Sequence, residues 1–188
     1  MRRRTGGRSA RVRSAVLDAT LEALAEVDPS EVTISEIARR AGVHATSIQR
    51  RWGSRENVLL DAMLTLSQEK LPIPDTGNLR DDMLGFARSM TAYFATPLGE
   101  ALVQTMAATA DDAILAANRT QFWQARYDTA RVIIDRAILR KEVAAETDPQ
   151  LAMELLVAPL HFRKLLTRQA IDDRFIENMV DTLVRGLS

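Results

Sequence analysis

The stretch Thr33–Trp52, TISEIARRAGVHATSIQRRW, decides how the rest of the chain is interpreted. Thr33 and Glu36 have the spacing of a capping box, in which a hydroxyl and a carboxylate satisfy free N–H groups at a helix start. Apolar residues recur at helical spacing until Gly42, a residue suited to the left-handed turn that ends many helices. Val43 then restarts the apolar pattern. The stretch therefore predicts two short helices joined by a tight turn, a helix–turn–helix.

The second helix of this pair carries polar side chains suited to nucleic acid. Ile48 and Trp52 are expected to pack inward, which leaves hydroxyl, amide and guanidinium groups on the other faces. Such groups bond to phosphates and base edges, so we expect this helix to lie in the major groove of DNA. Whether Arg50 reaches a guanine or a phosphate stays open. The residues predicted to contact DNA on and beside this helix are Thr33, His44, Ala45, Thr46, Ser47, Gln49, Arg50, Arg51, Ser54 and Arg55.

Positive charge is concentrated at the N-terminal end. The chain of 188 residues has no net charge, yet residues 1–60 hold 11 arginines against 7 acids, whereas residues 61–188 hold 14 basic against 18 acidic residues. Gly6-Gly7 and the lack of an apolar period predict a flexible arm over residues 1–8. Because arginine favours narrow A·T-rich minor grooves, Arg4 and Arg8 are predicted to enter the groove beside the motif. A solvated arm without a partner is the alternative.

Helical periodicity also dominates the remaining chain, so the predicted fold is all-α with about nine helices. A helix over about 9–27 and the two helices of 33–52 form a three-helix helix–turn–helix DNA-binding domain, residues 9–71. The start of a fourth helix, over about 54–71, shares the core of this domain. The segment LPIPDTG at 71–77 holds two prolines and a glycine and cannot continue a helix. We therefore place a domain boundary there and assign residues 72–188 to a helical ligand-binding and dimerisation domain.

The second domain is predicted to contain helices over about 79–95, 97–109, 118–143, 148–168 and 172–186. Pro159 lies inside the fourth of these and predicts a kink. Three acidic pairs, at 81–82, 111–112 and 172–173, lie at helix starts. Carboxylates at a helix start offset the positive end of the helix dipole and cap free N–H groups, so we interpret the pairs as caps rather than as metal or acid–base sites.

The residue inventory argues against an enzyme. The chain has no cysteine and only two histidines, His44 and His161, and it lacks a zinc-protease motif, a glycine-rich phosphate loop and a serine nucleophile elbow. We expect no catalytic residue, no metal and no cofactor. No apolar run approaches the roughly 18 residues of a membrane span, and Asp18 and Glu22 interrupt any signal-peptide core. A cytoplasmic protein without a membrane partner is expected.

Taken together, these features resemble the tetracycline-repressor (TetR) family of transcriptional regulators. The resemblance covers about residues 9–66 and rests on T-I-x-x-I-A-x-x-A-G-V at 33–43, on a recognition helix that ends in an aromatic residue, and on GSRENVL at 53–59. It implies a homodimer that binds palindromic double-stranded operator DNA and is released by a small-molecule effector. The family usually has tyrosine where this chain has Gln49, and serine or threonine where it has His44, so we expect its specificity to differ there.

The last helix supports a dimer. Its apolar stripe is wider than one contact within a subunit needs, and we predict that it packs with the helix from Asp148 against the same two helices of a second copy. The predicted interface residues are Leu155, Phe162, Phe175, Met179, Leu183 and Leu187. A helix buried within one subunit is the alternative. Half-sites one helical turn of DNA apart, about 34–36 Å, or a multiple of it, would follow.

A ligand site between the C-terminal helices is the least defined prediction. Aromatic and methionine side chains at helical spacing line pockets, but they also form ordinary cores. The residues predicted to contact an effector are Phe86, Met90, Tyr93, Trp123, Tyr127 and His161. The sequence leaves open a DNA-binding protein that has no ligand, and an activator in place of a repressor.

Overall fold

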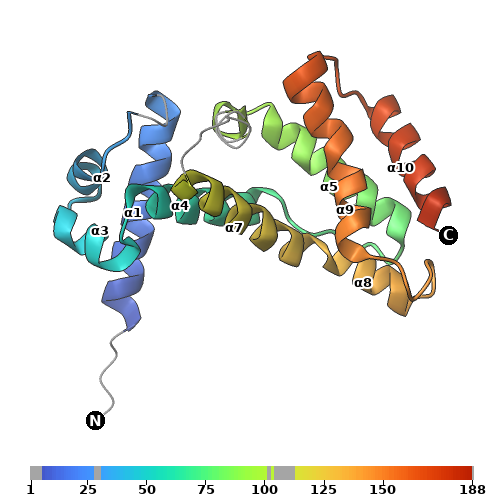
Figure 1. The fold of residues 1–188 in the computed structure, drawn as a ribbon, viewed down its shortest axis with the longest axis horizontal. Coiled ribbons are helices and arrows are strands. Elements are labelled where there is room, and N and C mark those ends of the chain that lie inside the picture. The colour runs from blue at the N-terminus through green and yellow to red at the C-terminus, as the bar shows by residue number, and fades with distance from the viewer. Residues whose placement is uncertain (1–5, 28–30, 101–102, 104–112, 188) are drawn as a thin grey trace, which may run out of the picture.

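The computed structural model describes residues 6–27, 31–100, 103 and 113–187, and these residues form helices and connecting turns without a strand (Figure 1). The predicted all-α fold is confirmed. The helices are α1 (Gly6–Glu26), α2 (Ile34–Ala41), α3 (Ala45–Trp52), α4 (Arg55–Lys70), α5 (Leu79–Phe94), α7 (Ala113–Ala130), α8 (Val132–Leu139), α9 (Pro149–His161), the π-helix η1 (Phe162–Thr167) and α10 (Asp173–Leu187).

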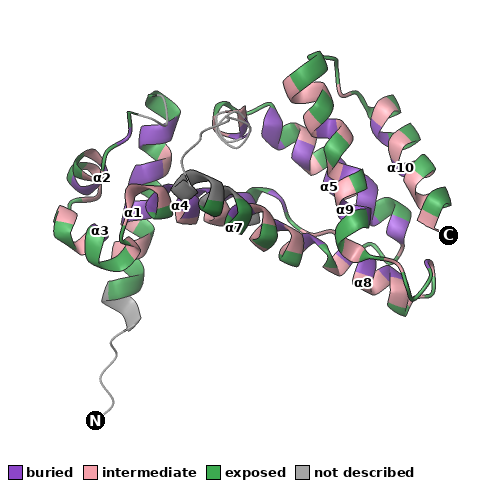
Figure 2. Ribbon diagram, in the orientation of Figure 1, coloured by how far each residue is buried: buried purple, intermediate pink, exposed green. Residues whose placement is uncertain are grey.

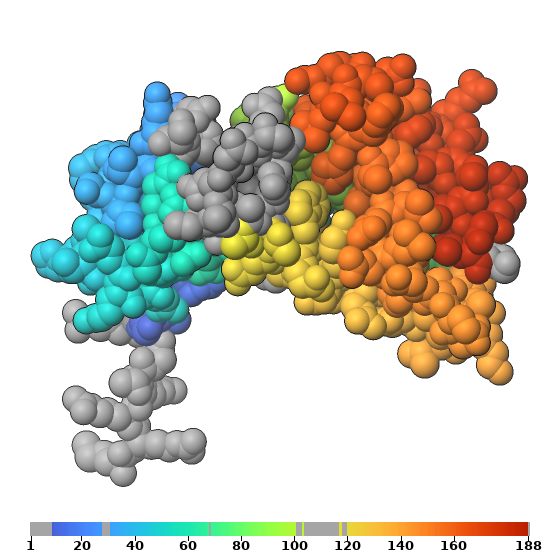
Figure 3. Space-filling view, viewed as in Figure 1, coloured from blue at the N-terminus to red at the C-terminus, as the bar shows by residue number. Residues whose placement is uncertain are grey.

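The molecule has two lobes (Figures 1 and 3). The first, which we call the head, is built from α1, α2 and α3. The second, the body, contains α5, α8, α9 and α10. Helices α4 and α7 run from the head towards the body and pack against each other. In both lobes the buried residues lie on the inner faces of the helices (Figure 2).

The helix–turn–helix forms as its capping residues predict. The Thr33 hydroxyl accepts the N–H of Glu36 at 3.2 Å and caps α2. Gly42 takes a left-handed conformation with φ +64°, and Val43 N–H bonds to Ala38 O at 3.0 Å, which closes the helix end. The Glu36 carboxylate binds Arg39 and Arg40 instead of completing the capping box.

The long helix predicted over residues 118–143 is wrong in its continuity and its ends. The chain forms α7 from Ala113 and α8 from Val132, because the turn at Arg131 tightens until Ile134 N–H bonds to Arg131 O at 2.9 Å. Helix α8 ends at Leu139, where Lys141 takes a left-handed φ of 60°. The N–H of Glu142 then bonds to Ala137 O, the Schellman pattern, with lysine where glycine would have signalled the end.

Two further differences concern helix ends. Helix α1 begins at Gly6, so residues 6–8 of the predicted flexible arm are helical. The helix predicted over 148–168 is α-helical to His161 and continues as the π-helix Phe162–Thr167. Pro159 has no N–H to offer to Leu155 O, and this missing donor precedes the change of hydrogen-bonding pattern by three residues.

The non-helical segment 71–78 is bound to the body by buried polar contacts. The fully buried carboxylate of Asp82 accepts the Thr76 N–H at 2.7 Å and the Thr76 hydroxyl at 2.8 Å. Arg140 donates to the same carboxylate at 3.4 Å, and Arg136 donates to Pro74 O at 3.0 Å. Asp82 therefore anchors this segment. The prediction that it caps a helix is wrong.

The other acidic pairs can be compared with the same prediction. Asn78 supplies the cap of α5, because its side-chain oxygen accepts the Asp81 N–H at 2.9 Å. Asp172 accepts the Phe175 N–H at 2.8 Å at the start of α10, as a cap does. Asp173 instead accepts from Arg88 of α5 at 2.9 Å. The pair at 111–112 lies outside the described residues.

Candidate DNA-binding surface and internal pocket

Helix α3 is fixed to the head through its apolar side. Ile48 is fully buried, and the half-buried ring of Trp52 packs against the same core. The Trp52 indole Nε1–H donates to Asp61 Oδ2 on α4 at 2.9 Å. These inward contacts, which the spacing of the two residues predicts, leave the polar face of α3 outward.

Asp61 joins the three helices that position this face. Besides the Trp52 indole of α3, its carboxylate binds the Arg13 guanidinium of α1 through both oxygens, with Arg13 Nε 3.1 Å from Oδ2. Arg13 also donates to the Thr65 hydroxyl at 3.1 Å. Sequence reasoning missed this carboxylate. Its four-residue spacing from Thr65 on α4, opposite one of the arginines of α1, gives only a weak signal.

The residues predicted to contact DNA divide into an exposed set and a set with partners inside the head. His44, Thr46, Gln49 and Arg50 are exposed, and Ala45 and Ser47 are half-buried beside them. His44 makes no side-chain cap bond at the start of α3. The exposed set therefore presents an imidazole, a hydroxyl, an amide and a guanidinium along one helix face, the groups that read base edges and bind phosphates.

Arg51, which is exposed, and Arg55, which is half-buried, both hydrogen-bond to other residues of the head. Arg51 donates to the backbone and hydroxyl oxygens of Ser9 on α1, at 3.2 and 2.9 Å, and lies 5.2 Å from the centre of the Trp52 ring. Arg55 donates to Val32 O at 3.1 Å. Both side chains stabilise the position of α3 and α4 in the head, a role that the sequence prediction did not assign to them.

Thr33 and Ser54 lie at the starts of α2 and α4. Each hydroxyl oxygen accepts an N–H of its own helix, from Glu36 and Asn57 respectively, at 3.2 Å. The Thr33 hydroxyl proton is still a donor, which is the group that a phosphate oxygen requires, whereas the Ser54 hydroxyl also hydrogen-bonds to the Glu56 carboxylate. Of the predicted minor-groove arginines, Arg4 lies outside the described residues, and the described part of Arg8 is its helical backbone.

Charge on α2 is balanced within the head. Glu36 accepts from Arg39 at 2.7 Å and from Arg40 at 2.7 Å, and Arg40 reaches Glu26 of α1 at 2.6 Å. Hydrogen bonds from Arg39 and then Arg40 lower the pKa of Glu36 to about 2. Arg40 therefore links α2 to α1.

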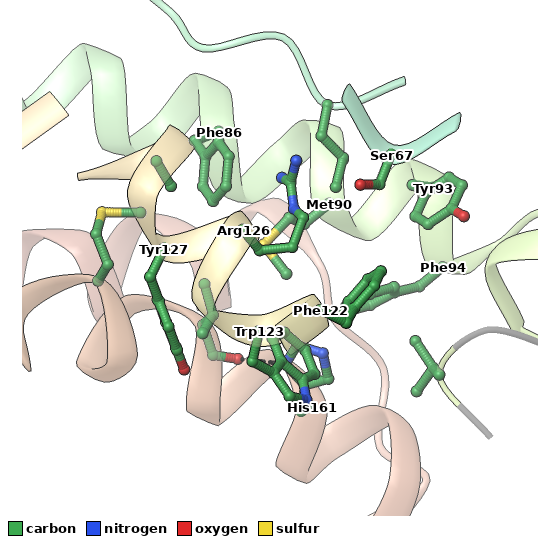
Figure 4. A pocket seen from close by; sticks show the side chains of 15 residues that line it. Ser67, Phe86, Met90, Tyr93, Phe94, Phe122, Trp123, Arg126, Tyr127 and His161 are labelled. Atoms are coloured by element: carbon green, nitrogen blue, oxygen red, sulfur yellow. Dashed lines mark hydrogen bonds between the residues drawn. The ribbon is translucent and has the colours of Figure 1, made fainter. Parts of the chain in front are cut away.

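A pocket lies in the body between α4, α5, α7 and α9 (Figure 4). The cavity between its side chains has a volume of about 50 Å³. All six residues predicted to contact an effector line it. The full lining is Ser67, Leu71, Phe86, Met90, Tyr93, Phe94, Val103, Phe122, Trp123, Arg126, Tyr127, Ala130, Met153, Val157 and His161.

The aromatic part of the lining is packed edge to face. The His161 ring lies 4.9 Å from Phe94 and 5.3 Å from Trp123, and Phe122 lies 5.4 Å from Trp123, measured between ring centres. His161 Nδ1 lies 3.0 Å from Val157 O. A carbonyl can only accept, so Nδ1 carries the proton and Nε2 of the neutral ring is an acceptor. Burial lowers the pKa of His161, which favours this neutral form.

Sequence reasoning missed Arg126 as a lining residue. Its side chain is 7% exposed and lies among Phe86, Met90 and Ser67 in Figure 4. Burial lowers the pKa of Arg126 and raises that of Tyr93 to about 12. The available signal was spacing, because Arg126 lies four residues after Phe122 and four before Ala130, on the buried stripe of α7.

The predicted dimer residues differ in exposure. Leu155 and Phe162 are 49% and 53% exposed, and Leu151 and Leu166 continue the same row along α9 and η1. On α10, Phe175, Met179, Leu183 and Leu187 are half-buried, while Ile176 and Val180 fill the core. Phe175 is also covered by Arg163, whose guanidinium lies 3.6 Å from its ring centre. An apolar row on α9 is thus left without a partner within the described chain.

Two further observations concern membrane spans and metal ions. None of the described helices has the length and apolar content needed to cross a bilayer. Among the described residues, no group of three or more His, Asp or Glu side chains is arranged to hold a metal ion.

Comparison with known proteins matches both lobes. Residues 73–183 match the family model "Tetracyclin repressor-like, C-terminal domain", and residues 16–62 match "Bacterial regulatory proteins, tetR family". The HTH-type transcriptional regulator AqdR of Rhodococcus erythropolis is 38% identical over 154 residues, 82% of this chain and 74% of that protein. The uncharacterized HTH-type regulator YdeS of Bacillus subtilis is 27% identical, over 92% of this chain and 88% of that one.

Solved structures agree. The TetR family transcription regulator SCO0332 superposes with a TM-score of 0.82 and 29% identity, over 94% of this chain and 98% of that one. FadR from Bacillus subtilis, solved in complex with stearoyl-CoA, shares the fold at a TM-score of 0.65 and 15% identity, over 93% and 99% of the two chains. With a family match over more than half its length, this chain belongs to the TetR family of helix–turn–helix transcriptional regulators.

Proposed function

We propose that this regulator is a homodimeric repressor that binds a palindromic operator and is released when a small molecule enters the body pocket. The observation that carries the proposal is the position of α4. Asp61 on this helix holds Trp52 of α3, and Ser67 and Leu71 at its far end line the pocket. Six residues of α-helix separate Asp61 from Ser67, about 9 Å.

This geometry couples the two sites through one rigid element. A molecule that displaces Ser67 or Leu71 also displaces the attachment of α3. In a dimer such a displacement changes the spacing of two recognition helices, which must match half-sites about 34–36 Å apart. Release follows only if the molecule binds the displaced state more tightly than the DNA-bound state.

The relatives support regulation by DNA binding, since AqdR and YdeS are both named HTH-type regulators. FadR carries a small molecule, stearoyl-CoA, on the same fold. For this chain the exposed face of α3 is the proposed reading surface, with Thr46, Ser47 and Gln49 at base edges or nearby phosphates and Arg50 at a guanine or a phosphate.

DNA binding is tested with the full chain by selecting bound sequences from a random pool. Arg50→Ala is then measured against Arg88→Ala, which removes an exposed arginine of α5 in the other lobe. A phosphate contact predicts uniformly weaker binding and a salt slope smaller by about one, whereas a guanine contact predicts relaxed specificity at one base. Selection that enriches no sequence would refute operator binding, and equal behaviour of the two variants would remove Arg50 from the interface.

The dimer is tested at the exposed row of α9. Leu155→Glu combined with Phe162→Glu should convert the protein to a monomer, because each places a charge in the proposed interface. Leu139→Glu is the matched control, since Leu139 is 82% exposed at the end of α8. Light scattering at micromolar concentration reports the mass. A monomeric mass for the unmodified chain would refute the homodimer.

A further inference from the structure

The body pocket holds a positive charge that the described part of the chain does not neutralise. Arg126 projects from α7 and is 93% buried, and its Nη1 has no hydrogen-bond partner among the described residues. Among the described residues, no carboxylate forms an ion pair with it. Arginine keeps its proton in proteins, so the site cannot remove the charge by losing one. An unpaired buried charge is strongly unfavourable, which makes Arg126 an exception that calls for a partner.

A second polar group in the same lining shares this condition. Among the described residues, the buried Tyr93 hydroxyl also has no hydrogen-bond partner. Figure 4 shows its oxygen at the end of the ring that points away from Arg126, so the two groups do not converge on one point. The Arg126 guanidinium has five N–H donors. A buried, charged donor in an apolar pocket fits an acceptor that carries negative charge.

We propose that the pocket takes an amphipathic monoanion, with a carboxylate at Arg126 and an apolar body among the aromatic side chains. This inference rests on the proposed function, in which the occupant of this pocket is the effector. One arginine matches one negative charge, and the flat carboxylate matches the guanidinium fork. Phe94, Phe122 and Trp123 supply the apolar surface.

The surrounding charges set the direction in which such a molecule lies. Trp123, Tyr127 and His161 also line a more open groove on the outer side, together with Phe162, Leu165 and Leu166. Glu154 lies in that groove and repels an anionic head group. The carboxylate therefore lies inward at Arg126, and the apolar body extends towards the groove.

The test compares two probes of equal length on the full chain, decanoate and 1-decanol, by calorimetry in the absence of DNA. We expect decanoate to bind at least about tenfold more tightly, the factor that a charge-assisted hydrogen bond confers. Arg126→Met should abolish this preference. The matched control is Arg131→Met, which removes an exposed arginine five residues further along and should leave the preference unchanged.

A second readout separates a ligand-binding role from a packing role. Methionine in place of Arg126 removes an unpaired buried charge, so the ligand-free variant should melt at a higher temperature than the unmodified protein. A lower melting temperature would identify Arg126 as part of the packing and overturn the proposal. So would a preference for decanoate that survives Arg126→Met, or binding of 1-decanol as tight as that of decanoate, or binding of neither probe.

These experiments can refute the proposed function and the proposed ligand class separately. If decanoate binds with the expected preference but leaves the selected operator bound, the assignment of the ligand class stands and release by that ligand is wrong. If neither probe binds while the operator is bound specifically, the DNA-binding function stands and the monoanion is wrong.

Discussion

Replacing Asp61 with alanine tests whether one carboxylate fixes the recognition helix. The change removes the acceptor of the Trp52 indole at 2.9 Å and the ion pair with Arg13. The half-buried indole N–H left without an acceptor costs about 1–2 kcal/mol. Arg13 is 37% exposed, so solvent screening limits its ion pair to roughly 0.5–1 kcal/mol. The expected loss for Asp61→Ala is therefore about 2 kcal/mol.

Thermal unfolding measures this loss, since a chain of this size shifts its Tm by roughly 2–4 °C per kcal/mol. We expect Asp61→Ala to lower the Tm by about 4–8 °C. Asp61→Asn keeps an acceptor for Trp52 and should lose about half as much. The control is Asp135→Ala, which breaks an exposed pair with Arg131 worth roughly 0.3–0.5 kcal/mol.

The same variants report on function, because a loosened α3 must be ordered again when it binds. Operator affinity of Asp61→Ala should fall at temperatures well below its Tm, while that of Asp135→Ala should not. A Tm loss no larger than that of the control would refute the role of Asp61 in the head. Full operator affinity with the expected Tm loss would show that Asp61 supports the fold without positioning α3.

Three further outcomes follow from particular residues. Gly42→Ala should lower stability by about 1–2 kcal/mol in denaturant unfolding, because φ of +64° is strained for alanine while its Cβ would meet nothing within 4 Å; an unchanged midpoint would contradict this. Hydrogen bonds from Arg39 and Arg40 lower the pKa of Glu36 from its ordinary value of 4.5 to about 2, so its contribution to stability is complete above pH 4.5 and falls as pH drops towards 2; the Tm gap between Glu36→Gln and the unmodified protein should shrink over that range. Burial lowers the pKa of His161 below 6.5, so stability should fall as pH drops below 6.5, and His161→Gln should flatten this part of a pH series; parallel curves would show that His161 does not contribute.

The sequence predicted the parts of the fold that depend on local chemistry. Thr33 and Gly42 mark the ends of α2 by capping and by left-handed conformation, which neighbours in the chain decide. The break at Arg131 and the π-helix after His161 were not predictable in the same way. The break at Arg131 depends on how α7 and α8 pack, because arginine does not itself interrupt a helix. Pro159 predicts a kink in α9, but it does not predict that the chain continues as a π-helix.

The residues of the pocket also divide into those that the sequence predicted and one that it did not. Its aromatic and methionine residues were found because they recur at helical spacing on apolar faces. Arg126 was missed because its neighbours in sequence, Gln124 and Asp128, are exposed and make that part of α7 look like a solvated face. Only the packing of α4 and α5 against α7 buries the guanidinium, and those contacts join residues far apart in the chain.

The anchored segment at 71–78 has a consequence for modular exchange between relatives. Thr76 donates to Asp82, and Pro74 O accepts from Arg136. Arg140 donates to the same Asp82 carboxylate, and all three of these partners belong to the body. A chimera that joins a foreign head after residue 77 would separate Thr76 from Asp82 and Pro74 from Arg136, and the buried Asp82 carboxylate would keep Arg140 but lose both donors from Thr76. A junction inside α4, before Ser67, keeps the segment with its body. Recombination between such regulators should therefore tolerate crossovers within a continuous helix better than crossovers in the apparent linker.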